Sequence, residues 1–174
     1  MHKIKLSNFL LFFIFISNIN HVFADQNPIV KRVNFIVSDL DQSLKIYRDV
    51  LGMEIFEIKN SDTDSYSYPV FNLPEEALIR FASLNMGKEK RAFALTEVKN
   101  TPLPVNKGIR MSTVVISISD LEDKYNQIGL MGLFRTDIDS DHTPEGQSFS
   151  EFSFLDFDGH LIVLYEIKDY FCYF

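Results

Sequence analysis

A nine-residue stretch that occurs twice constrains the fold of this 174-residue chain more than any other feature. Residues 33–41 (VNFIVSDLD) and 114–122 (VVISISDLE) share an alternating apolar run, the tripeptide Ser-Asp-Leu and a following acid, at a constant offset of 120 − 39 = 81 positions. Alternation is typical of a strand, and Ser-x-x-Asp or Ser-x-x-Glu is typical of a helix start whose Ser side chain accepts a backbone N–H. The sequence therefore predicts two copies of one strand-then-helix module.

Apolar periodicity and turn residues extend each copy by three further strands. The first copy has a strand around 32–37, a helix over 41–51 ended by Gly52, one helical turn at 74–76, and strands over 53–59, 78–84 and 91–98. The second has strands over 111–118, 133–136, 149–155 and 160–167, and a helix over 120–128 ended by Gly129. Each module has one main helix, which is too little to bury the apolar surface of its sheet. We therefore expect an α+β fold in which two βαβββ modules pair into a cup-shaped mixed sheet with the helices outside.

The two ends of the sequence differ from the modules in composition. Residues 1–24 combine Lys3 and Lys5, an apolar run over 10–16 and small residues before Ala24, a pattern typical of a signal peptide cleaved after Ala24. We expect one domain over 25–174, with module 1 at 28–99, a linker at 100–108, module 2 at 109–168 and an aromatic tail at 169–174. The expected location is secreted or periplasmic, with no membrane attachment after cleavage.

Composition and missing motifs exclude several classes of function. The formal net charge is −7, without clusters of Lys and Arg, which argues against a nucleic-acid partner or an anionic membrane surface. The single cysteine, Cys172, allows no intrachain disulfide. There is no Gly-x-Ser-x-Gly elbow and no glycine-rich phosphate loop. His142 and His160, the two histidines outside the predicted signal peptide, are interpreted as solvated surface residues.

Two motifs, together with the repeat, resemble the vicinal oxygen chelate family, which includes glyoxalase I, fosfomycin- and bleomycin-resistance proteins and extradiol dioxygenases. The first lies in 32–53, with Ser-Asp-Leu, Tyr47 and Leu51-Gly52-Met53, and the second is Asp156-Phe157-Asp158-Gly159 in 154–166. The resemblance covers nearly all of the chain after residue 24. It implies paired βαβββ modules around a cavity, and a protein that forms a homodimer, in some members with modules exchanged between chains.

The resemblance also implies four metal-ligand positions, and they carry the wrong residues here. They fall at Arg32, Leu95, Thr113 and Val163, with Glu97 one alternation beyond Leu95 on the same face. One carboxylate does not hold a divalent ion, because such sites need several converging oxygen or nitrogen ligands. We therefore expect no metal and no other cofactor.

The strand alternation gives a predicted ligand-binding face of mixed polarity. Its predicted ligand-binding residues are Arg32, Asn34, Glu97, Thr113, Ser117 and Tyr165, with Val115 and Val163 between them. Such a wall is typical of a small-molecule pocket. Arg32 must be paired in a partly buried cup, either with an internal acid, for which Glu97 is the nearest candidate, or with an anionic ligand. The sequence leaves both alternatives open.

Three functions remain compatible with the sequence. The first is an exported protein that binds a small molecule, with an anion favoured by Arg32, without a metal, close in kind to the antibiotic-sequestering members of the family. The second is a metal-dependent glyoxalase-like lyase or dioxygenase, which would need a divalent metal. The third is a non-catalytic dimerisation or interaction module. Whether the protein is an enzyme is left open by the sequence.

Overall fold

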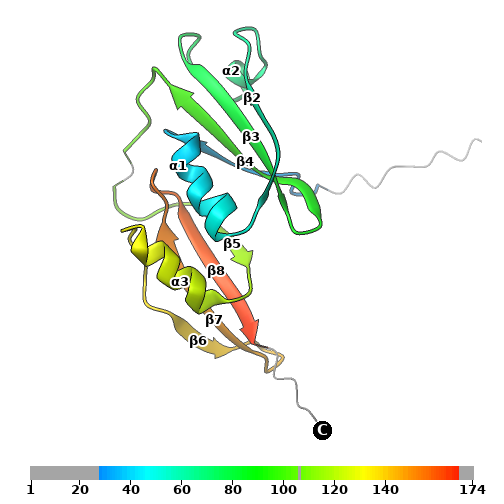
Figure 1. Ribbon diagram of the computed structural model, residues 1–174, viewed down its shortest axis with the longest axis vertical. Coiled ribbons are helices and arrows are strands. Elements are labelled where there is room, and N and C mark those ends of the chain that lie inside the picture. The colour runs from blue at the N-terminus through cyan, green and yellow to red at the C-terminus, as the bar shows by residue number, and fades with distance from the viewer. Residues whose placement is uncertain (1–27, 106, 169–174) are drawn as a thin grey trace, which may run out of the picture.

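The fold consists of two four-stranded mixed sheets, one from each module, with helices packed on them (Figure 1). The computed structural model describes residues 28–105 and 107–168. The first sheet has the order β1-β4-β3-β2 and the second has the order β5-β8-β7-β6. The strands are β1 (Val33–Val37), β2 (Glu54–Asn60), β3 (Leu78–Met86), β4 (Glu89–Lys99), β5 (Thr113–Ser117), β6 (Asp139–His142), β7 (Ser148–Leu155) and β8 (Leu161–Lys168). The predicted signal peptide at 1–24 and the aromatic tail at 169–174 lie outside the described residues.

The same topology is repeated in both modules. The first strand of each pairs in parallel with the last, so that Val37 lies opposite Glu97 and Ser117 lies opposite Tyr165. The remaining neighbours within each sheet are antiparallel. The α+β class and the two βαβββ modules are thus confirmed. The described strands form two separate hydrogen-bonded sheets, and the modules are joined through side chains and not through one continuous ladder.

The helices are short, and the main helix of each module lies on one face of its sheet (Figure 1). They are α1 (Leu40–Leu44), its π-helical continuation η1 (Lys45–Val50), α2 (Ser67–Val70) and α3 (Leu121–Leu130). The predicted helix over 41–51 corresponds to α1 with η1. Residues 74–76, predicted as one helical turn, form a turn closed by the backbone N–H of Ala77 and the backbone oxygen of Pro74 at 3.1 Å, and the short helix of this region is α2. The helix α3 passes through Gly129 to end at Leu130. Among the described residues, no helix combines the length and apolar character needed to cross a membrane.

The starts of α1 and α3 differ from the predicted capping by Ser38 and Ser119. In α1 the cap is Asp39, whose Oδ1 accepts the backbone N–H of Gln42 at 2.9 Å. In α3 the cap residue Asp120 has φ +58° and makes no side-chain cap bond. The prediction was wrong by one residue in the first module because Asp is as good an acceptor as Ser at this position.

One hydrophobic core extends through both modules. Phe35 and Phe93 of the first sheet pack against Tyr47 of η1, with ring centroids 6.1 and 4.8 Å from that of Tyr47. In the second module Tyr125 of α3 meets Phe152 of β7 edge-on. The buried residues of this core are Val37, Leu40, Leu44, Ile46, Tyr47, Val50, Met53, Ala82, Leu84, Phe93, Leu95, Ile116, Leu121, Ile128, Phe152, Phe154, Ile162 and Leu164.

Two strands in the second module differ from expectation. The strand predicted at 133–136 is reduced to a single bridge between Arg135 and Phe154. The strand that borders β7 is instead β6, where His142 is exposed. An acidic sequence such as 137–141 has low strand propensity, and here pairing with β7 overrides it.

Candidate ligand-binding site

A cavity of about 550 Å³ lies on the face of the first sheet that is turned away from α1. Its floor is formed by Arg32 just before β1, by Asn34 of β1 and by Phe81 and Ser83 of β3, and the start of β4 contributes Arg91. The edge strand β2 and the loop that follows it supply the other walls, with Glu57, Lys59, Asn60, Ser61, Asp62, Asp64, Ser65, Tyr66, Ser67 and Phe71. This volume lies within the usual range of small-molecule pockets.

Two guanidinium groups line this cavity, which we call the Arg32 cavity. Arg32 donates from Nε to the backbone oxygen of Arg91 at 2.9 Å, and its guanidinium carbon lies 5.5 Å from the centroid of the Phe81 ring. Arg91 has its guanidinium 5.0 Å above the ring of Phe56. Within the described part of the chain, neither arginine has a carboxylate oxygen within 4.0 Å. The cavity wall also carries the carboxylates of Glu57, Asp62 and Asp64, and Glu57 pairs with Lys59 at 3.6 Å. Arg32 and Arg91 are thus the cations of this wall that have no acid partner within the described residues.

The floor also contains neutral hydrogen-bonding groups. Thr96 donates from Oγ1 to Oδ1 of Asn34 at 3.0 Å, which fixes the orientation of the amide. Ser83 is only 1% exposed, and its hydroxyl has no hydrogen-bond partner among the described residues. A buried hydroxyl left without a partner costs free energy, and this oxygen is shielded from the open space of the cavity.

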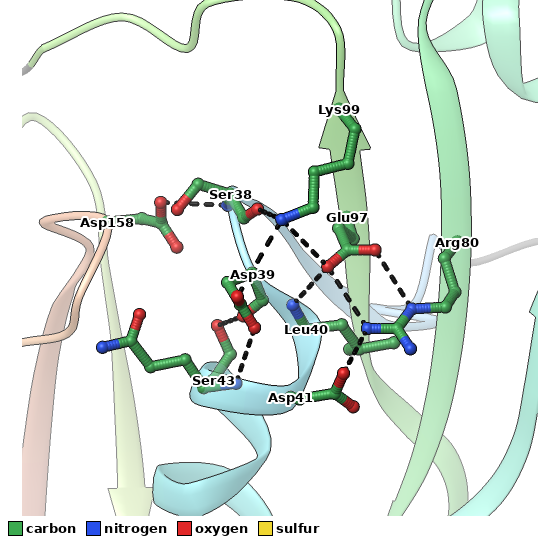
Figure 2. Close-up of polar contacts among 10 residues, drawn as sticks. Ser38, Asp39, Leu40, Asp41, Ser43, Arg80, Glu97, Lys99 and Asp158 are labelled. Carbon is green, nitrogen blue, oxygen red and sulfur yellow. Dashed lines mark hydrogen bonds and ion pairs between the residues drawn. The ribbon is translucent and has the colours of Figure 1, made fainter.

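Glu97 was predicted to share this cavity, and the prediction was wrong. The side chains of β4 alternate, and Glu97 lies opposite Val37, whose side chain faces the helix. Its Oε1 accepts the backbone N–H of Leu40 at 2.8 Å, and its Oε2 accepts from Nε of Arg80 at 3.0 Å (Figure 2). The predicted pair of Arg32 and Glu97 does not form, because the two side chains lie on opposite faces of the first sheet.

The contacts of Glu97 form one charged network at the start of α1 (Figure 2). Arg80 also donates to Oδ2 of Asp41 at 2.8 Å, and Nζ of Lys99 lies 3.5 Å from Oε1 of Glu97 and donates to the backbone oxygen of Ser38. The guanidinium of Arg80 has its pKa raised, first by its hydrogen bond to Asp41 and then, against the opposing effect of burial, by Glu97. This network fixes the helix start and has no direct contact with the cavity.

The predicted contacts in the second module do not reach the Arg32 cavity. Thr113 and Ser117 of β5 are exposed, Val115 between them is 60% exposed, and Tyr165 of β8 is half-buried against Phe149. All lie on the face of the second sheet that is turned away from α3. The structure therefore brings together Arg32 and Asn34 and leaves Thr113, Ser117 and Tyr165 apart from them within one chain.

The family positions for metal ligands do not fit a metal ion. Leu95 is fully buried in the core on the helix side of β4, away from Arg32. Arg32 brings a positive charge, and Thr113 and Val163 lie in the other module. Among the described residues there is no group of three or more His, Cys, Asp or Glu that would hold a metal.

His160 and its neighbours contact the first module, which the sequence did not predict. The ring of His160 stacks on Phe35 at 4.3 Å, and its Nε2 lies 2.9 Å from the backbone oxygen of Ile36, so this residue is not a solvated surface histidine. Tyr47 donates its hydroxyl to Oδ2 of Asp156 at 2.8 Å. Burial raises the pKa of Asp156, and burial followed by the charge of Asp156 raises the pKa of Tyr47 well above its usual value.

Comparisons with known proteins agree with this architecture. The sequence matches the family model described as Glyoxalase/Bleomycin resistance protein/Dioxygenase superfamily over residues 19–164. No curated protein matches it. Among solved structures, a glyoxalase family protein from Bacillus cereus has a TM-score of 0.63 at 15% identity, covering 84% of this chain and 99% of its own.

Two further solved structures have the same fold. A glyoxylase/bleomycin resistance protein/dioxygenase domain from Frankia sp. has a TM-score of 0.57 at 17% identity, covering 82% of this chain and 99% of its own. The fosfomycin resistance protein FosX from Listeria monocytogenes, in complex with Mn(II) and sulfate, has a TM-score of 0.51 at 14% identity, with coverage of 78% and 88%. At these identities the likeness is one of fold.

Proposed function

Because the chain belongs to the Glyoxalase/Bleomycin resistance protein/Dioxygenase superfamily, we propose that it binds a small anionic molecule in the Arg32 cavity, without a metal ion. The observation that carries this proposal is the pair of guanidiniums of Arg32 and Arg91, which line one cavity and have no carboxylate partner within the described residues. Arginine binds carboxylates and phosphates through charge-assisted hydrogen bonds. The ring of Phe81 offers an apolar surface next to Arg32.

Two observations favour ligand binding over the alternatives. An interaction module without ligand would have its sheet face filled by its own side chains, whereas this face carries a cavity of about 550 Å³. A metal-dependent enzyme would need convergent ligands, and the positions that the family uses carry Arg32, Leu95, Thr113 and Val163. Export through residues 1–24, and with it a secreted or periplasmic location, remains part of the proposal.

We further propose that the protein is a homodimer in which a second copy covers the open face of the second sheet. Thr113, Ser117 and Tyr165 have the composition of a ligand-cavity wall, yet they do not contact the Arg32 cavity of their own chain. Val115 at the centre of this face is 60% exposed, so an apolar side chain is available there for a second copy to cover. Sedimentation velocity on the wild type and on Val115→Asp tests this. A monomeric wild type would contradict it.

The binding proposal is tested with phenylphosphonate, benzoate and neutral benzamide as probes in a thermal-shift assay. The two anions should raise the melting temperature with or without EDTA, and benzamide should not. Arg32→Gln should weaken anion binding by about tenfold, the effect of one lost charge-assisted hydrogen bond. Arg48→Gln is the matched control, since Arg48 pairs with Asp49 on the surface outside the cavity.

Two results would contradict the proposal. One is a stoichiometric divalent metal in the purified protein whose removal by EDTA abolishes binding. The other is equal binding of the anions and benzamide by both the wild type and Arg32→Gln. Loss of folding stability in Arg32→Gln with unchanged anion binding would show that Arg32 acts as a structural residue only.

A further inference from the structure

A second and larger cavity lies at the boundary between the two modules. Its volume is about 1170 Å³. One wall comes from the ends of β1 and β4, with Ile36 and Val98, and continues into the linker with Leu103. The opposite wall comes from the segment after α3, with Leu133 and Phe134, and from the turn between β7 and β8. We call this cavity the inter-module cleft.

The inter-module cleft is distinct from the Arg32 cavity. Of all the residues that line the two cavities, only Phe71 is common to both. The cleft wall is also more apolar, since aliphatic, aromatic and proline side chains from five separate segments face it. Its volume of about 1170 Å³ lies above the usual range for small-molecule sites. A long apolar molecule suits such a cleft better than a compact polar one.

One fixed positive charge stands on the wall of the cleft. Arg110 donates from Nε to the backbone oxygen of Gly159 at 2.7 Å and from Nη1 to the backbone oxygen of Gly108 at 2.9 Å. Within the described residues, no carboxylate oxygen lies within 4.0 Å of this guanidinium. Its orientation is thus set by two neutral carbonyls. This leaves its charge uncompensated by an acid, a preorganised arrangement for an anionic group.

Each of the other charged groups of the cleft has at least one partner. Lys99 contacts Glu97 and Asp39 at 3.5 and 3.9 Å. Asp156 accepts the hydroxyl of Tyr47 and the backbone N–H groups of residues 158 and 160. Asp158 accepts the backbone N–H of Ser38 through Oδ1, and its Oδ2 is buried without a partner among the described residues. That oxygen is shielded from the open space, and Arg110 is the cation of the cleft wall that has no acid partner within the described residues.

From this geometry we propose that the inter-module cleft binds a long-chain amphipathic carboxylate. Its apolar chain lies between the linker wall and the wall formed by Leu133 and Phe134, and its carboxylate accepts hydrogen bonds from Arg110. The proposal does not depend on the function assigned to the Arg32 cavity, because the two sites have different walls and different cations.

Isothermal titration with dodecanoate, dodecanol and dodecylamine, below their aggregation concentrations, tests the proposal. Dodecanoate should bind at one site per chain, and the alcohol and the amine should bind at least about tenfold more weakly, because they cannot accept from a guanidinium as an anion does. Arg110→Gln should remove the preference for dodecanoate, and Arg110→Lys should keep part of it. Arg110→Lys, with its positive charge, covers the case in which Arg110→Gln does not fold.

The apolar wall is tested separately with exposed residues, so that folding is preserved. Phe134 is 63% exposed and lines the cleft, and Phe134→Asp should weaken binding of dodecanoate and dodecanol together. Leu130→Asp is the matched control, because Leu130 is 89% exposed on α3 and does not line the cleft. Arg32→Gln should leave dodecanoate binding unchanged.

Each of the following results would overturn the proposal. For the wild type, these results are an absence of dodecanoate binding, or equal affinity for dodecylamine and dodecanoate. For the variants, they are undiminished dodecanoate binding by Phe134→Asp, or loss of dodecanoate binding in Arg32→Gln. The last result would place the carboxylate in the Arg32 cavity and so would leave the proposed anion binding there intact. Absence of phenylphosphonate binding beside normal dodecanoate binding would contradict only the proposal for the Arg32 cavity.

Discussion

Replacement of Glu97 by Gln tests the assignment of this residue to the helix start, where the sequence had suggested a ligand cavity. The carboxylate is 8% exposed and contacts the backbone N–H of Leu40, the guanidinium of Arg80 and the ammonium of Lys99. Glu97→Gln keeps the size and one acceptor oxygen of the side chain but removes its charge. The expected effect is therefore on folding stability, with anion binding in the Arg32 cavity unchanged.

The size of the effect follows from the exposure of the partners. Breaking a fully buried ion pair costs about 3–5 kcal/mol. Arg80 is 30% exposed and retains Asp41, so part of its charge remains solvated and paired. The Gln oxygen can still accept from Leu40. We expect the free energy of unfolding to fall by about 2–3 kcal/mol, which corresponds to roughly 4–12 °C in melting temperature for a chain of this size.

The second module supplies a matched control in Glu166. Its Oε1 accepts the backbone N–H of Leu121 at 3.4 Å, the position that corresponds to Leu40, but no Lys or Arg of the described residues lies within 4.0 Å. Glu166→Gln should therefore lower the free energy of unfolding in urea by only about 0.5 kcal/mol, because a long, partly buried hydrogen bond at the helix start is all that changes. Equal losses for the two variants, or a loss below about 1 kcal/mol for Glu97→Gln, would refute the reasoning.

Three further predictions concern the helix cap, a buried acid and the N-terminus. Asp39→Ala should lower the free energy of unfolding by about 1 kcal/mol and Ser38→Ala by much less, since only Asp39 caps α1; equal losses in urea titrations would contradict this. Burial raises the pKa of Asp156, so its folded form favours the bound proton, and the contribution of this group to stability is present at low pH and is lost as the pH rises through the folded pKa. The unfolding free energy of the wild type relative to Asp156→Asn should thus fall as the pH rises above the ordinary Asp value of 3.8, whereas a constant difference in urea titrations at several pH values would exclude this linkage. Finally, N-terminal sequencing of protein recovered from the exported fraction should begin after Ala24, and an intact N-terminus at Met1 would exclude cleavage.

The repeat at an offset of 81 positions was enough to predict the two modules. In both copies, alternation typical of a strand is followed directly by a pattern typical of a helix start. One further signal in the sequence indicates the same duplication. Glu97-Val98-Lys99 and Glu166-Ile167-Lys168 end β4 and β8, and each glutamate accepts a backbone N–H at the helix start of its own module. The repeated Glu-x-Lys thus indicates that Glu97 serves the helix side of its sheet, a signal that strand alternation alone does not provide.

Sequence alternation failed on β4 for a physical reason. Phe93 to Val98 are all buried, so both faces of this strand are covered and a period of two carries no information on which face meets the helix. The face is decided by the parallel register with β1, which places Glu97 opposite Val37. Arg32 and Asn34 do line one cavity together, because β1 is covered differently on its two faces and its alternation therefore indicates the correct side.

The contacts of His160 were beyond sequence reasoning because they join the two modules. A histidine after a turn glycine is usually solvated, and nothing near it in the sequence indicates that Phe35 will stack on its ring. The inter-module cleft is hidden for the same reason, since its walls come from segments on both sides of the linker. Local patterns predict elements, whereas the fit between modules depends on their relative placement.

The turn at 156–160 has a consequence for how the polypeptide reaches its native state. The hydroxyl of Tyr47, the backbone N–H of Ser38 and the stacked face of the Phe35 ring have partners in residues that are synthesised more than a hundred positions later. During translation these three groups therefore lack these partners until the C-terminal hairpin emerges. Such distant pairings slow folding and expose apolar surface in the interval, so this chain is expected to need protection by a chaperone until its last hairpin is complete.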